Sequence, residues 1–219
     1  MPFHYEATSD FDNSISEVKI LLDLSSSDES HREMFMKLAM VSLVTKFQVF
    51  VEKILEEFRY NLNKMASRKI STYMKMNSLR LSMDSPNPLI GIKKHKNFTE
   101  DKKRSIVRYL RSISFLSDDE YLIDEAFMFD TKFPLGKTGK TELINLLKQI
   151  DGIDNPFAEF GDEKFEQLDS VLLNRHSIIH QDRFLGTDNT VNEALVFLKE
   201  LVDYIDNYLY QKMEIIKNT

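Results

Sequence analysis

Residues 32–65, REMFMKLAMVSLVTKFQVFVEKILEEFRYNLNKM, decide the fold class of this chain. Apolar side chains recur there at spacings of three and four over many turns, which is typical of one face of an α-helix. Further valines widen this stripe, so the first half of the helix is predicted to be buried on most sides. The valines are Val41, Val44, Val49 and Val51. We therefore expect one long helix in the N-terminal half of the chain.

The composition points to an all-α fold. The 219 residues include only six Gly and five Pro, and residues 3–85 contain neither. A β-sandwich or barrel needs such turn residues between its short strands. The absence of Cys excludes disulfides, thiolate metal sites and cysteine nucleophiles. The length favours a single domain over residues 1–219, with a basic insert or loop region over about 67–111.

Shorter helices are expected around the long one. Their predicted ranges are 13–24, 100–116, 138–150, 163–180 and 190–214. Ser14 or Asn13 is the expected N-cap of the first, with Glu17 completing a capping box. Residues 67–98 and 117–135 have no clear period. The expected architecture is a helical bundle with one long helix in its N-terminal half and a C-terminal helix pair.

Charge is unevenly distributed along the chain. Residues 53–111 carry 15 Lys and Arg against 5 Asp and Glu, whereas residues 112–170 carry 5 against 14. The basic part could bind RNA phosphates, or the two parts could neutralise each other within the fold. The candidate RNA contacts are Lys93, Lys94, Lys96, Lys102, Lys103, Arg104 and Arg108.

The sequence predicts a cytoplasmic protein without a membrane anchor. No run reaches the ~18 consecutive apolar residues of a membrane span. The first ten residues, MPFHYEATSD, lack the basic and apolar regions of a signal peptide.

The stretch LLNRHSIIHQD, residues 172–182, concentrates the side chains that can carry chemistry. It places Asn174, Arg175, His176 and His180 near the end of a predicted helix. On a continuous helix, Arg175 and His180 are separated by about 140° around the axis. They can meet at one substrate only if the helix ends between them or if a second copy supplies the partner groups.

This stretch resembles the Arg-x4-His signature of the HEPN superfamily, in which a polar residue directly follows the Arg. The position late in an all-α chain, before a last amphipathic helix, is also similar. VSLVTKFQVFVEKIL at 41–55 resembles the hydrophobic helix that opens many prokaryotic HEPN domains. Gln48 stands where the family's hydrophobic–Phe–Glu pattern has its acid, and Glu52 follows one turn later.

The resemblance implies metal-independent RNA cleavage by a homodimer whose two motifs face each other, without a cofactor. Histidine can transfer protons near neutral pH, and the Arg fork binds phosphate oxygens while staying charged. His180 would be the general acid or base, and Arg175 would hold the scissile phosphate. Asn174 and His176 would support them. The resemblance also suggests a toxin or phage-defence effector, with an antitoxin or defence-system protein as its partner.

Other interpretations of these residues remain open. His176 and His180 share a helix face and could bind zinc, although Ser177 occupies the position of the zincin Glu. PLGKTGKT at 134–141 approaches a phosphate-binding loop, but Pro134 stands at the first Gly position. A flexible loop leading to a helix capped by Thr138 is the alternative.

Two further interpretations concern the protein as a whole. One is a non-catalytic HEPN-like module that binds a partner protein, RNA or nucleotide. The other is a purely structural role, in which Arg175 caps its helix or pairs with an acid such as Asp182.

Overall fold

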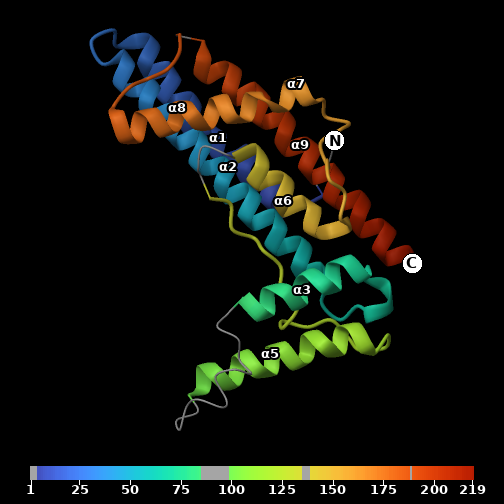
Figure 1. Ribbon diagram of the computed structural model, residues 1–219. Coiled ribbons are helices and arrows are strands. Elements are labelled where there is room, and N and C mark those ends of the chain that lie inside the picture. Colours follow the sequence, from blue (N-terminus) through green and yellow to red (C-terminus); the bar gives the residue numbers. More distant parts are fainter. Residues whose placement is uncertain (1–3, 85–98, 135–138, 188) are drawn as a thin grey trace. The chain divides into compact units, whose positions relative to one another are not determined.

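A computed structural model describes residues 4–84, 99–134, 139–187 and 189–219 and confirms the all-α fold. Within these ranges, the β-pairing consists of one isolated bridge between Ala66 and Leu122. The helices are shown in Figure 1. In chain order they are α1 (Glu6–Ser27), α2 (Arg32–Leu62), the 3₁₀ turn η1 (Ser67–Lys69), α3 (Thr72–Asp84), α5 (Glu100–Ser117), α6 (Gly139–Asp151), α7 (Asp162–Phe165), α8 (Gln167–Gln181) and α9 (Thr190–Asn218).

The long predicted helix is α2, with 31 residues. Its apolar positions form the centre of the core, and Phe47, Phe50 and Phe58 are fully buried. By length and composition alone α2 could cross a membrane, with a mean hydropathy of 1.5 over 18 residues, but core helices pass the same test. Here Lys46 pairs with Glu17 of α1 at 2.6 Å, so α1 lies against α2 as a packed core neighbour does.

The chain divides into two compact units. The first consists of Met1–Glu57, Thr131–Asn145 and Asn155–Gln211. The second consists of Phe58–Asp130, Leu146–Asp154 and Lys212–Thr219. Helices α2, α6 and α9 therefore contribute residues to both units.

Helix α1 begins seven residues earlier than its predicted start at 13, because carboxylates distant in sequence cap it. Glu57 accepts hydrogen bonds from the backbone N–H groups of Glu6 and Ala7, both at 2.9 Å. Asp206 accepts from the N–H of Tyr5 at 3.1 Å. Ser14, the predicted cap, instead lies inside the helix and donates to the carbonyl of the preceding turn. The donors at a helix start need partners, and here α2 and α9 supply them.

The predicted helix over 163–180 is in fact two helices. Helix α7 ends at Phe165, and α8 begins at Gln167. Phe165 is fully buried and stacks on Phe157 with ring centroids 4.0 Å apart. This stacked pair anchors the break, and α8 and α9 then form the expected C-terminal helix pair.

The second unit contains a helix that the sequence period did not indicate. Helix α3 lies within the apparently irregular stretch 67–98 and packs on α5. Residues 118–134, which also lack a clear period, form no helix. This segment is held to α3 by the N–H of Met128, which donates to Ser78 Oγ at 2.7 Å.

Candidate functional site

Helix α8 of the first unit carries the Arg-x4-His stretch in its last two turns. The helix runs without interruption to Gln181, so it does not end between Arg175 and His180. Five residues of α-helix rotate a side chain by about 140°. The structure therefore excludes the first route by which the two groups could meet on one substrate.

Lys37 of α2 holds the end of α8. Asp182 caps the helix in the left-handed region with φ 52°, and its N–H donates to the carbonyl of Ile178 at 3.1 Å. Lys37 Nζ donates to the Asp182 carbonyl at 2.6 Å and to its carboxylate at 3.0 Å. Hydrogen bonds raise the pKa of Lys37 above its ordinary value, and the bond to Glu33 contributes more than the bond to Asp182. A permanent positive charge thus stabilises the negative end of the helix dipole.

Asn174 holds the loop that follows the helix. Its side chain is buried, donates to the carbonyl of Leu185 at 2.7 Å and accepts from the N–H of Leu185 at 3.0 Å. Both polar ends of the amide are therefore satisfied by one backbone residue of the loop. Asn174 therefore fixes the backbone of this loop, and its support of the catalytic pair stays a prediction.

Arg175 has no salt bridge or hydrogen bond to any residue that the structure describes. Its Nε is buried without a hydrogen bond, and its side chain is half-buried overall. Asp182, the acid that a structural role would have paired with Arg175, is bound by Lys37. His180 is exposed, and its ring lies 4.3 Å from that of His176 between centroids, tilted by 48°.

Gln48 and Glu52 act together on the segment that precedes α6. Gln48 Nε2 donates to the Phe133 carbonyl at 3.0 Å, and Glu52 accepts from the Phe133 N–H at 3.2 Å. Burial acts to raise the pKa of Glu52, but hydrogen bonds from Lys132 and from Phe133 outweigh it, and the pKa lies below its ordinary value. The acid one turn beyond the family's Glu position thus anchors backbone here.

The model of the RiboL-PSP-HEPN family matches residues 9–211, nearly the whole chain. The chain belongs to the RiboL-PSP-HEPN family. No curated protein and no solved structure matches it. HEPN domains commonly dimerise and act on RNA, and the superfamily includes both nucleases and non-catalytic members.

The two other motif interpretations gain no support from the described part of this HEPN domain. No group of three or more His, Asp or Glu side chains there is arranged to hold a metal ion. Lys140 of the loop-like stretch pairs with Glu166, and its N–H donates to Asp169 at 3.0 Å. These carboxylates occupy the start of α6, where a phosphate would have to bind. Thr138, the predicted cap, lies outside the described residues.

The seven predicted basic RNA contacts differ in their surroundings. Lys93, Lys94 and Lys96 lie outside the described residues. Lys102 is half-buried, and Lys103 pairs with Glu100 at 2.7 Å. The remaining two, Arg104 and Arg108, are exposed on α5 and line a pocket of about 510 Å³ in the second unit.

Proposed function

We propose that this HEPN domain is a metal-independent endoribonuclease that works as a homodimer. The observation that carries the proposal concerns Arg175 and His180. Lys37 binds Asp182, and neither Arg175 nor His180 pairs with an acid among the described residues. An arginine kept for structure alone would be expected to satisfy its buried donor.

The chemistry follows from the two side-chain types. Cleavage through the ribose 2′-OH requires a proton to leave that hydroxyl and another to reach the leaving oxygen. Imidazole can do either near neutral pH, so His180 is the general acid or base. The guanidinium of Arg175 holds the scissile phosphate and stabilises its developing charge. His176, in ring contact with His180, supports the proton transfer.

The composite site follows from the angle between the two groups on α8. The two groups leave α8 of one copy about 140° apart, whereas a two-fold axis beside α8 would bring the Arg175 of one copy toward the His180 of the other. Apolar exposure on the same helix supports burial against a partner. Leu173 lies two turns before His180 on the same face and is 46% exposed. Ile179 lies one turn after Arg175 and is 49% exposed.

The proposal is tested by incubating purified protein with total cellular RNA in the presence of EDTA. We expect the wild type to cleave and both Arg175→Ala and His180→Ala to lose cleavage while remaining folded and dimeric. His31→Ala is the matched control, because the side chain of this exposed histidine contacts its sequence neighbours Asp28 and Ser30, outside the motif. Absence of cleavage by folded, dimeric wild type would refute the nuclease and favour a module that binds a partner protein, RNA or nucleotide.

Mixing the two inactive variants tests the composite site. After unfolding and refolding together in equal amounts, about half of the dimers are heterodimers if the copies pair at random. Each heterodimer keeps one intact Arg175 and one intact His180 on opposite copies. We expect partial recovery of cleavage above either variant alone, and no recovery would contradict a site shared between copies.

We further propose a biological role as a toxin or phage-defence effector in the cytoplasm. Uncontrolled RNA cleavage is harmful to a cell, so such a protein would need an antitoxin or defence-system partner. Expression of the wild type should then arrest growth, and His180→Ala should relieve the arrest at equal protein level. Growth arrest that persists with His180→Ala would separate toxicity from the motif.

A further inference from the structure

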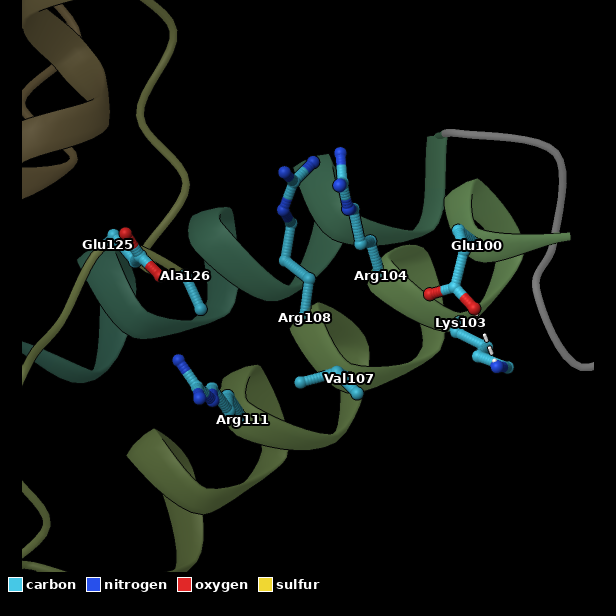
Figure 2. Close-up of a pocket in the computed structure, with 8 residues that line it drawn as sticks. All are labelled: Glu100, Lys103, Arg104, Val107, Arg108, Arg111, Glu125 and Ala126. Atoms are coloured by element: carbon cyan, nitrogen blue, oxygen red, sulfur yellow. Dashed lines mark hydrogen bonds and ion pairs between the residues drawn. The ribbon is translucent and has the colours of Figure 1, made fainter.

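The second unit has a basic pocket on α5 that the HEPN motif does not use. It measures about 510 Å³, which is within the range of small-molecule sites. Figure 2 shows Arg104 and Arg108 extending from α5 side by side in the same direction. Lys103 and Arg111 also line the pocket, and Val107 contributes apolar surface to its lining.

Four cationic side chains line this pocket against two carboxylates, those of Glu100 and Glu125, so its positive charge is only partly neutralised. Lys103 pairs with Glu100 at 2.7 Å, and Arg111 pairs with Asp124 at 3.1 Å. Among the described residues, no acidic side chain pairs with Arg104 or Arg108. Like charges one helical turn apart repel each other and destabilise the helix. Two neighbouring guanidinium groups therefore gain from any ligand that brings two negative charges.

The charge count favours a phosphate monoester over a single carboxylate or a single phosphodiester. A carboxylate carries one negative charge, and each phosphodiester of an RNA chain also carries one. A phosphate monoester carries about −1.5 to −2 at pH 7 and offers three strong acceptor oxygens. Guanidinium forks bind such oxygens in pairs, so Arg104 and Arg108 together match one monoester in charge and in donors.

We propose that this pocket binds a phosphate monoester, carried either by a free mononucleotide or by the phosphorylated end of an RNA. Arg104 and Arg108 bind the phosphate, and Val107 contacts the less polar part of the ligand. If the monoester is the end of an RNA, the proposal rests on the proposed function of the HEPN motif. If the monoester is a free mononucleotide, the proposal is independent of that function, because it requires no cleavage.

Direct binding to the full chain tests the site. The first probes are 5′-AMP and adenosine, measured by calorimetry on the wild type. We expect 5′-AMP to bind and adenosine to show no measurable binding, because the phosphate supplies the contacts. Equal binding of the two would overturn the proposal. Lowering the pH from 7.5 to 5 should weaken 5′-AMP several-fold, since the monoester loses its second charge near pH 6.

The second pair of probes is an RNA octamer with a 5′-phosphate and the same octamer with a 5′-hydroxyl. These are bound to the His180→Ala chain, which leaves the RNA uncut if the motif is catalytic. Tighter binding of the phosphorylated octamer identifies the RNA end as a ligand. Binding of 5′-AMP with no preference between the octamers identifies the free mononucleotide. If 5′-AMP does not bind and the two octamers bind equally, the proposed phosphate site is refuted. This outcome has no bearing on whether the motif cleaves RNA.

Substitution assigns the binding to the two arginines. Arg104→Gln/Arg108→Gln should weaken 5′-AMP about tenfold or more, because hydrogen bonds between charged groups are among the stronger ones. The matched control is Lys19→Gln/Arg68→Gln, which removes two charges from exposed side chains outside the pocket. It should change binding less than twofold. An equal loss in both double variants would show general electrostatic attraction and overturn a built site.

Discussion

Replacing Asn174 by Ala should release the loop that follows the motif helix. Two hydrogen bonds to Leu185, at 2.7 and 3.0 Å, are lost together. Each contributes about 0.5–1.5 kcal/mol, and leaving partly buried partners without a substitute adds to the cost. Because Leu185 is only half-buried, water recovers part of the loss. We expect the free energy of unfolding to fall by about 2 kcal/mol.

Two measurements check this value. Urea unfolding followed by circular dichroism should show a midpoint lower by about 1 M, since the urea dependence is about 1–3 kcal/mol per M. Hydrogen exchange should show faster exchange at the Leu185 amide, because that N–H loses its acceptor. RNA cleavage should fall with it, because the last turn of α8 is no longer supported from the loop.

A matched substitution provides the control. Asn207→Ala removes an amide that donates to a carbonyl one turn earlier at the surface of α9, and it should stay within about 0.5 kcal/mol of the wild type. Asn174→Asp keeps the acceptor for the Leu185 N–H but places a carboxylate oxygen against its carbonyl. It should destabilise as well. A loss below 0.5 kcal/mol for Asn174→Ala, with unchanged exchange at Leu185, would refute the anchoring argument.

Three further predictions concern other contacts. Lys37→Met should speed hydrogen exchange in the last turn of α8 and lower RNA cleavage several-fold, with little change in overall helix content. Unchanged exchange in that turn would contradict the proposal that Lys37 holds the end of α8 through Asp182. Glu52→Gln should cost about 1 kcal/mol at pH 7 because it weakens the bond to Phe133. Because the pKa of Glu52 is lowered in the folded chain, this stability difference should be fully present above about pH 4.5 and lost as the pH falls below it. A constant difference down to pH 2.5 would refute the argument that the ionised carboxylate stabilises the fold. Gly152→Ala should lower the melting temperature, because φ is +80° and the new Cβ would lie 3.0 Å from the Tyr73 ring; an unchanged melting temperature would contradict this.

The elements that the sequence predicted best are those with strong local signals. Helix α2 has a long apolar period, and it was expected within a few residues of its observed ends. Helix α5 was expected over 100–116 and spans Glu100–Ser117, because acidic residues follow Thr99 at its start. In both, the decisive information lies within the segment itself.

The elements that the sequence missed depend on distant partners. The start of α1 is set by Glu57 and Asp206, and no pattern within residues 1–27 indicates those carboxylates. Helix α3 has a weak amphipathic pattern and is stabilised by packing on α5. The break before Gln167 depends on the stacking of Phe165 with Phe157, which only the folded chain brings together.

The same distinction between local signals and distant partners applies to the candidate site. Arg175, His176 and His180 could be found because their spacing is a motif in one helix. Lys37, which secures the end of that helix, binds Asp182 from 145 residues away and carried no sequence signal. The contact between Asn174 and the loop also carried no sequence signal, because its partner Leu185 binds through backbone atoms.

The capping of α1 by Asp206 also sets an order of events during synthesis. Thr8 Oγ1 donates to Asp206, 198 residues later in the chain. At about 5–20 residues per second, the ribosome needs roughly 10–40 s to make that acceptor after the first helix has been translated. During this interval the Tyr5 N–H and the Thr8 hydroxyl lack their native acceptor, whereas Glu57, which caps Glu6 and Ala7, has already been made. The nascent chain thus completes the cap of its first helix only when Asp206 of its last helix has been made.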